Sequence, residues 1–185
     1  MISNVEINKN VKLSEHFTLA EMTKTSVKTK DGNIPSHVHI ENLKRLTKWL
    51  ERLRQRCNQR PHPLTPSLTP NPSPKGEGNF KGEGEACGSG GREEPIIINS
   101  AYRSPQVNKA VGGAAKSNHL TGCAADIRCK GIEQAIRYAC ILLDISDESQ
   151  EPFDELLIEQ SAKSIWVHFA VRPEGNRRRI EFIRK

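Results

Sequence analysis

The chain has 185 residues, of which 35% are hydrophobic and 27% are charged, and its formal net charge is +6. This length allows one domain with its own core, and no apolar run reaches the roughly 18 residues that a membrane helix needs. The positive charge admits a nucleic-acid-binding protein as a hypothesis that rests on charge alone. Aromatic residues make up only 5% of the chain, so the stacking platforms of single-strand binders are scarce. The basic C-terminal segment 172–185 is expected to be a solvated strand edge.

The N-terminal sequence lacks the basic start and apolar stretch of a signal peptide. We therefore expect synthesis in the cytoplasm, so a protein acting outside it would need another route of release. The five cysteines are odd in number and form no CxxC pair, which argues against a zinc ribbon and against a disulfide framework. Buried free thiols are the expected state.

Residues 58–94 are expected to form a flexible surface insertion. Six of the eleven prolines lie between Pro61 and Pro74, and seven of the thirteen glycines lie between Gly76 and Gly91. Such a composition cannot bury enough apolar surface to offset the entropy of ordering the chain. The alternative is a proline-rich ligand for a partner protein. The sequence on either side predicts a single domain, 1–185, which this segment interrupts.

The remaining elements follow from hydrophobic periodicity. An apolar stripe predicts a helix over 40–57, Ser104 and Pro105 predict the start of a short helix, and a second stripe predicts a helix over 132–143. Strands are expected at 95–99, 124–128, 155–160, 165–171 and 179–183. The apolar face of the second long helix is expected to hold Ile132, Ala135, Ile136, Ala139, Cys140 and Leu143. This mixture predicts an α+β fold, a mainly antiparallel sheet with helices packed on one side.

Candidate metal ligands occur in two segments. His119 and Asp126 lie seven residues apart, and imidazole and carboxylate groups both bind zinc. The small Ala124 shares a strand face with Asp126 and leaves room for an ion, and Gly122 allows a close backbone approach just before the strand. Strand alternation over 165–171 separates His168 from its branched neighbours, so it could point into a cleft beside Asp126.

One aspartate and two histidines form a ligand set that leaves a fourth zinc position open for water. Each of these residues taken alone has an ordinary structural interpretation, and spacing alone leaves both interpretations open. The combined pattern is more specific, and it reads Ser117-x-His119-x-x-Gly122-x-Ala124-x-Asp126 followed by Trp166-x-His168. It resembles the zinc D-Ala-D-Ala carboxypeptidase family, which also includes phage endolysins that cut L-alanyl-D-glutamate bonds and the D,D-dipeptidases of vancomycin resistance. Segments 98–113 and 13–22 extend the resemblance over most of the chain outside the insertion.

The resemblance implies a hedgehog/D-Ala-D-Ala-peptidase-like fold and assigns roles to individual residues. It makes His119, Asp126 and His168 the ligands of Zn²⁺. Arg103 would polarise the scissile carbonyl or pair with a substrate carboxylate, and Ser117 would hydrogen-bond the substrate. The structural alternatives are a surface salt bridge for Arg103 and a turn cap for Ser117.

A peptidase of this kind also needs a carboxylate that takes a proton from the zinc-bound water and passes it to the leaving amine. Many family members place an acid three positions before the last histidine, where this chain has Ile165. We favour Glu159 as the base, with Asp154 second. The alternative is that both acids are structural or exposed.

The resemblance therefore implies a zinc-dependent peptidase that cleaves peptidoglycan stem peptides at or next to a D-amino acid, as a carboxypeptidase or as an endolysin-like endopeptidase. We expect a monomer with peptidoglycan peptides as its partner and no nucleic acid. A prophage origin would let it reach the cell wall through phage-type release. The alternative is a non-catalytic, zinc-containing wall-binding or phage structural module, which Ile165 and the insertion both motivate.

Overall fold

The structure is a computed structural model, and it describes residues 11–59 and 94–184. The helical elements are α1 (Leu19–Met22), α2 (His37–Asn58), α3 (Pro105–Ala110), the 3-10 helix η1 (Asn118–Thr121) and α4 (Ile132–Ser149). The strands are β1 (Ile98–Ser100), β2 (Ala124–Cys129), β3 (Glu155–Gln160), β4 (Ile165–Ala170) and β5 (Arg179–Arg184).

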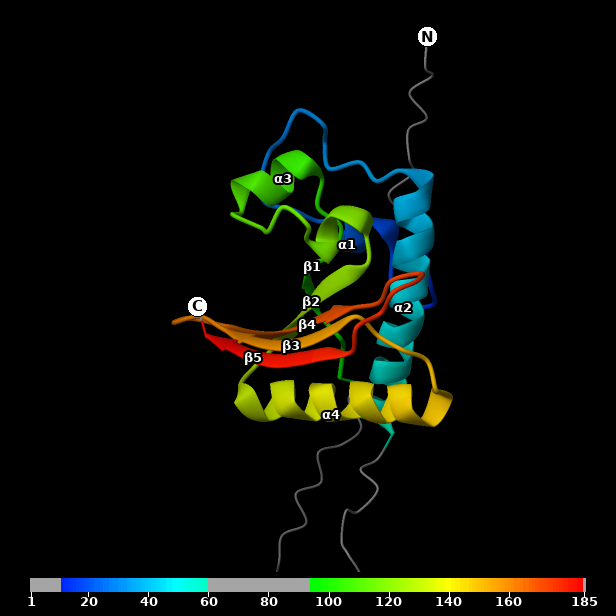
Figure 1. Cartoon of the computed structure of the whole chain (residues 1–185). Helices are drawn as coiled ribbons and strands as arrows, with labels where there is room; N and C mark the ends of the chain where they lie inside the picture. Colours follow the sequence, from blue (N-terminus) through cyan, green and yellow to red (C-terminus); the bar gives the residue numbers. More distant parts are fainter. Residues whose placement is uncertain (1–10, 60–93, 185) are drawn as a thin grey trace, which may run out of the picture.

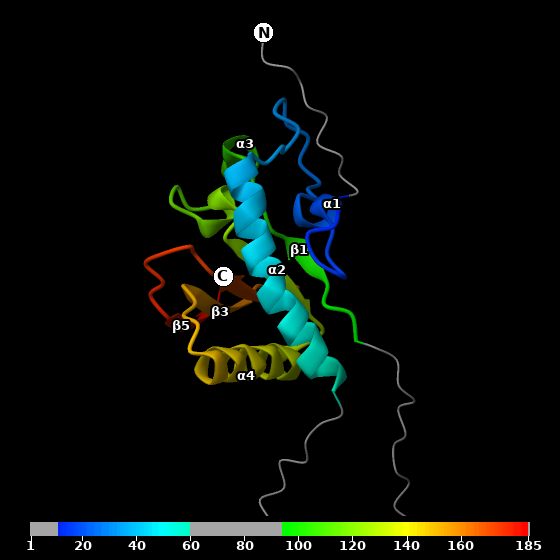
Figure 2. The same ribbon diagram turned by 90° about the vertical axis from the view of Figure 1, so that its right-hand side faces the viewer.

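The strands form one sheet in the order β1-β2-β4-β3-β5, in which only the β3–β5 pair is parallel (Figure 1). This arrangement confirms the predicted α+β class and the mainly antiparallel sheet. The long helix α4 lies along one side of the sheet, whereas α1, α3 and η1 lie on the other side. Figure 2 shows α2 passing the end of α4, where Arg52 of α2 donates to the carbonyl of Ile145 in α4.

The predicted stripe of α2 is buried in the core. Ser36 caps the helix by accepting a hydrogen bond from the backbone of His39. The side chains of Leu43, Leu46, Leu50 and Leu53 are fully buried. Trp49 packs on Phe169 of β4 with their ring centroids 5.2 Å apart. The helix therefore anchors the strand that carries His168.

The apolar face predicted for α4 is partly wrong. Ile132 and Ile136 are 44% and 49% exposed, and Cys140 is exposed as well. The buried side chains are instead those of Ala135, Tyr138, Ala139, Leu142, Ile145 and Ser146. The helix extends to Ser149, beyond the predicted end at residue 143, and the added turn brings Ile145 into the core. These buried residues recur at steps of three and four, so they form one stripe centred on Tyr138 and Leu142, which leaves Ile132 and Ile136 at its margin.

Residues close to the two ends of segment 60–93 lie side by side, because the backbone N–H of Glu94 donates to Oδ1 of Asn58 at 2.7 Å. Buried residues from both sides also share one hydrophobic cluster. Residues 60–93 of the predicted flexible insertion, with Cys87, lie outside the described residues, whereas Asn58, predicted as its first residue, ends α2. No helix in 11–59 or 94–184 combines the length and apolarity that crossing a membrane requires.

The cysteines that the structure describes are free thiols, of which Cys123 and Cys129 are buried, Cys57 is half-buried and Cys140 is exposed. Burial raises the pKa of Cys129 to about 11. The buried-thiol prediction therefore holds for Cys123 and Cys129 but not for Cys140. Strand β5 lies at the edge of the sheet with mostly exposed side chains, as expected for the basic C-terminal segment.

Candidate metal centre

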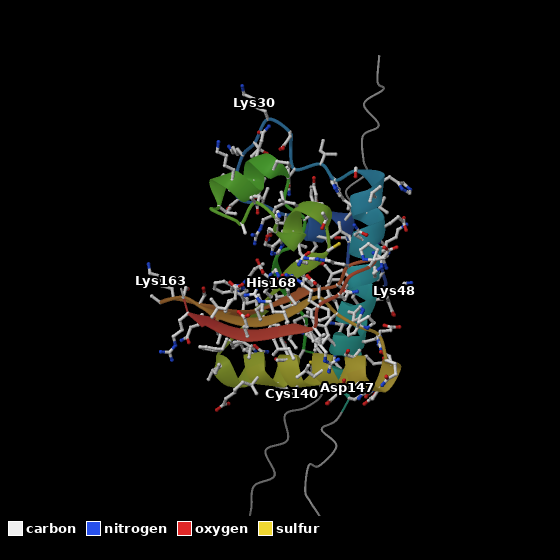
Figure 3. All side chains as sticks on the ribbon, viewed as in Figure 1. Lys30, Lys48, Cys140, Asp147, Lys163 and His168 are labelled. Atoms are coloured by element: carbon white, nitrogen blue, oxygen red, sulfur yellow. The ribbon has the colours of Figure 1, made fainter. Side chains whose placement is uncertain are left out.

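The register of the sheet places two of the three candidate ligands side by side. Asp126 of β2 and His168 of β4 are direct cross-strand partners. Their strand neighbours Ile127 and Val167 are fully buried on the opposite, apolar face. His168 therefore points away from the apolar layer, as the alternation predicts, and Figure 3 places it near the centre of the molecule.

The third candidate ligand, His119, comes from the short helix η1. Gly122 ends this helix with a φ of 72°, in the left-handed region that favours glycine. A Cβ atom at this position would lie 2.8 Å from the carbonyl oxygen of His39 in α2. The glycine therefore permits the close contact between η1 and α2 that holds His119 above the sheet.

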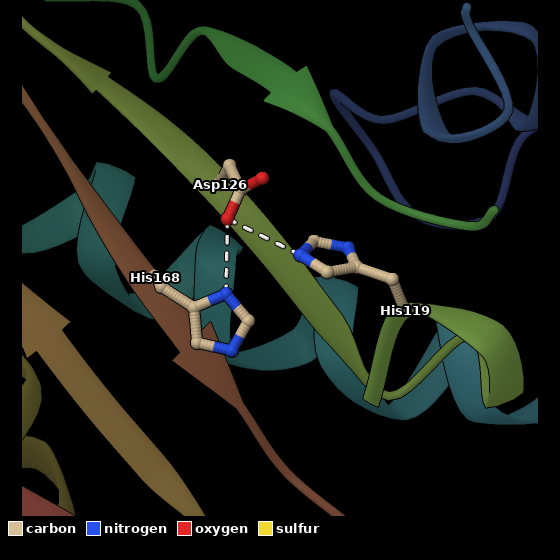
Figure 4. A group of neighbouring side chains, drawn as sticks. All are labelled: His119, Asp126 and His168. Atoms are coloured by element: carbon tan, nitrogen blue, oxygen red, sulfur yellow. Dashed lines mark hydrogen bonds and ion pairs between the residues drawn. The ribbon is translucent and has the colours of Figure 1, made fainter. Parts of the chain in front are cut away.

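The two histidine rings both face one carboxylate oxygen of Asp126 (Figure 4). Oδ1 of Asp126 lies 3.2 Å from Nε2 of His119 and 2.9 Å from Nδ1 of His168. All three residues are buried, and their potential ligand atoms lie within 4.8 Å of one another. Two imidazole nitrogens and a carboxylate oxygen at this spacing are a donor set that fits zinc.

Hydrogen bonds on the far side of each ring orient the two histidines. Nδ1 of His119 lies 2.6 Å from the carbonyl oxygen of Ala101. A carbonyl only accepts, so Nδ1 carries a proton and Nε2 is the ring nitrogen that could offer a lone pair to a metal held beside Asp126. His168 has the opposite arrangement, because Nδ1 faces Asp126 and Nε2 lies 3.4 Å from Oε2 of Glu155. Metal-binding histidines commonly use this pattern, with the second ring nitrogen directed to a carbonyl or carboxylate.

The two carboxylates on either side of His168 favour a positive charge between them. Burial alone would raise the pKa of Asp126, but His119 and His168 outweigh it and hold that pKa well below its usual range. Burial would lower the pKa of His168, yet the carboxylates of Asp126 and Glu155 raise it to about 9. The contact with His168 is the main reason why the pKa of Glu155 falls to about 2. Both carboxylates are therefore ionised at neutral pH.

Arg103 and Ser117 both make structural contacts, but only the cap made by Ser117 matches the alternative left open by the sequence. Nη2 of Arg103 donates to Oδ2 of Asp126 at 2.5 Å, in a pair that is mostly buried rather than at the surface. Oγ of Ser117 accepts from the backbone N–H of His119 and caps η1. A contact of either residue with substrate stays a prediction.

The position of the favoured base follows from the pairing of β3 with β4. Glu159 is the cross-strand partner of Trp166, and it is buried on the same face of the sheet as His168. Ile165 lies on the other face with Val167, since it is three residues from His168 on the same strand. An acid at position 165 would point into the apolar layer, so in this chain a base has to come from another element. The assignment to Glu159 stays a prediction.

Asp154, the second candidate base, is fully buried and closely bound by its neighbours. Nε and Nη2 of Arg177 each donate to its carboxylate at 2.8 Å, and Asn118 donates at 2.7 Å. Nε of Arg172 adds an ion pair at 3.0 Å. These contacts tie η1 to β3 and to the loop after β4, which favours the structural alternative for Asp154 while its catalytic role stays a prediction.

Replacing Asp154 with asparagine is expected to lower the free energy of unfolding by about 2–3 kcal/mol. Removing one partner of a fully buried ion pair costs roughly 3–5 kcal/mol. The loss is expected at or below the low end of that range here because the side chains of Arg172 and Arg177 remain partly exposed to water. Urea unfolding followed by circular dichroism measures the change. The control is Asp147→Asn, since Asp147 pairs with Arg178 at the exposed surface, and a loss below about 1 kcal/mol is expected there. Equal stability of Asp154→Asn and the wild type would contradict the structural role.

The sequence analysis did not assign a role to Glu155, Asn118 or the carbonyl of Ala101. A partial signal existed for Glu155, which stands in the acidic segment 154–159 and shares a strand face with Glu159. Asn118 directly precedes His119, but nothing in its position indicates a contact with Asp154 and Glu155. The contact of Ala101 is made by its backbone, which no side-chain pattern reveals.

The fold and the site define an α+β protein with a buried His-Asp-His group suited to a catalytic metal. The sequence profile described as Peptidase M15 matches residues 89–168, a segment that contains all three candidate ligands. The match supports the M15 family of zinc metallopeptidases. No curated protein matches the chain at a significant level.

Proposed function

We propose that the protein is a zinc-dependent peptidase that cleaves peptidoglycan stem peptides at or next to a D-amino acid. The observation that carries the proposal is the convergence of His119 Nε2, Asp126 Oδ1 and His168 Nδ1, with the tautomer of His119 set by a carbonyl on its far side. The Peptidase M15 match over the same residues supports the reaction class. The resemblance of the combined motif to D-Ala-D-Ala carboxypeptidases supports the substrate class.

The residues around this site have different proposed roles. Zinc, when bound, would lower the pKa of a coordinated water to about 7 and polarise the peptide carbonyl. Arg103 holds Oδ2 of Asp126 and leaves Oδ1 directed toward the histidines. Glu159, on the same face of the sheet as His168, would accept the proton of the water and deliver it to the leaving amine. This arrangement is compatible with removal of the terminal residue and with cleavage inside the stem peptide. The proposal also includes that the protein is a monomer and that it reaches the cell wall by phage-type release.

A pair of synthetic stem pentapeptides tests the substrate class. The first ends in D-Ala-D-Ala, and the second is identical except that both terminal alanines are L. Mass spectrometry after incubation with the zinc-loaded protein is expected to show loss of D-alanine or an internal cut in the first peptide and a much slower reaction in the second. Equal cleavage of both peptides would contradict selectivity for D-amino acids.

The second candidate function is a non-catalytic wall-binding or phage structural module that retains the zinc site. It is favoured by Ile165, which stands where many relatives have an acid and belongs to the apolar face. Zinc bound by the protein without cleavage of any stem or cross-linked fragment would support this candidate over the peptidase.

A further inference from the structure

Glu155 lies next to the candidate metal centre but outside its ligand set. It is the first residue of β3, and its cross-strand partner on β4 is Ala170, two residues beyond His168. Its side chain is only 12% exposed. Oε2 of this carboxylate lies 3.4 Å from Nε2 of His168, an ion-pair contact slightly longer than an ideal hydrogen bond.

The two carboxylates around His168 occupy opposite sides of its ring. Nδ1 faces Asp126 at 2.9 Å, where the three candidate ligands converge, and Nε2 faces Glu155. Glu155 therefore cannot join the ligand set around Nδ1. It is placed instead to accept the proton on Nε2, so that Nδ1 is the nitrogen that would offer its lone pair to a metal held together with Asp126 and His119.

Glu155 is itself held in place by three donors. Oε1 accepts from Nη2 of Arg177 at 2.7 Å and from Nη1 of Arg179 at 3.2 Å. Oε2 accepts from Nδ2 of Asn118 at 2.8 Å. A carboxylate restrained in this way is suited to fixing the orientation of a neighbour rather than to carrying protons between water and substrate.

Asn118 connects this support to the other histidine. It directly precedes His119 in η1, and its amide nitrogen donates to both Asp154 and Glu155. Its Oδ1 accepts from Nε of Arg172 at 2.9 Å. The carboxylate that contacts His168 therefore also restrains the helix that carries His119, so the two histidines are positioned together.

We propose that Glu155 is a positioning residue, which orients His168 so that this histidine binds the metal through Nδ1. The inference rests on the proposed zinc site and adds to it a residue outside the group of candidate ligands. An anionic acceptor on Nε2–H restrains the ring and makes Nδ1 a stronger donor, and loss of such a partner typically lowers metal affinity by roughly 10- to 100-fold.

Zinc affinity, measured on the full chain by competition with a chromophoric chelator, tests the proposal without reference to activity. Glu155→Leu is expected to bind zinc about 10- to 100-fold more weakly than the wild type. Glu155→Gln is expected to lose less affinity, because its amide oxygen still accepts from Nε2–H, and it carries the test if the leucine variant does not fold. The matched control is Glu181→Gln, since Glu181 also pairs with Arg179 but lies exposed on β5; wild-type affinity is expected.

A second readout is the Nε2–H proton of His168 in NMR spectra of the zinc-loaded protein. It is expected to exchange slowly in the wild type and in Glu155→Gln and to be lost to fast exchange in Glu155→Leu. Wild-type zinc affinity and an unchanged Nε2–H signal in both Glu155 variants would overturn the positioning role while leaving the metal site intact. Failure of the wild-type chain to bind zinc would instead overturn the metal site and the positioning role with it.

Discussion

Replacing His119 with alanine is expected to abolish tight zinc binding and, with it, the cleavage of wall peptides. The change removes one of three ligands and leaves only Asp126 and His168, a set too small for a stable tetrahedral site. The loss of affinity should exceed the roughly 10- to 100-fold that removal of a supporting partner causes. Zinc content after dialysis, together with the competition assay, measures the effect.

The matched control for this variant is His16→Ala. His16 is an exposed histidine that pairs with Glu51, far along the chain from the three ligands. Its replacement is expected to leave zinc content and cleavage at wild-type levels. Undiminished zinc in the His119→Ala variant would mean that the metal binds elsewhere.

Replacing Glu159 with glutamine is expected to lower kcat by about 100- to 10,000-fold while zinc stays bound, because general base catalysis contributes that range. The substitution keeps the shape of the side chain but removes its ability to take a proton. Steady-state kinetics on the stem peptide that ends in D-Ala-D-Ala, combined with zinc analysis of the same sample, separate the two effects. Loss of zinc together with activity would indicate that Glu159 supports the fold or the site rather than the proton transfer.

Glu181→Gln is the control for the glutamine substitution as well, since Glu181 occupies the same face of the sheet on the neighbouring β5 but is exposed. Wild-type kinetics are expected for it. Activity of Glu159→Gln close to that of the wild type would exclude Glu159 as the base. The remaining acids of segment 154–159 would then be the candidates for the base.

Local patterns predicted the strands that carry Asp126 and His168 and the helix α2, but not the short helix η1, which carries His119. The leucines of α2 follow a helical stripe, and all four of them are buried. The alternation over 165–171 predicted that His168 is separated from its branched neighbours, and the register between β2 and β4 places it beside Asp126. The buried face of α4 was not predictable from the apolar stripe alone, because it is centred on Tyr138 and Leu142, which pack in the shared core.

The contacts that organise the site depend on tertiary structure and could not be predicted from spacing. Glu155 and Asn118 meet only because η1 lies over the start of β3, and Arg177 reaches Glu155 from the loop that precedes β5. The pairing of Arg103 with Asp126 depends in the same way on β1 lying beside β2. Sequence analysis therefore identified candidate ligands, whereas the groups that orient them required the fold.

Digestion of purified peptidoglycan fragments, followed by mass spectrometry, tests the central claim most directly. The protein is assayed as prepared, after removal of metal by a chelator, and after zinc is restored, with His119→Ala in parallel. We expect loss of a terminal D-alanine or a cut inside the stem peptide, abolished by the chelator, recovered with zinc and absent from the variant. Cleavage that persists without metal, or no cleavage of stem and cross-linked fragments by the zinc-loaded protein, would contradict the assignment as a zinc peptidase of the cell wall.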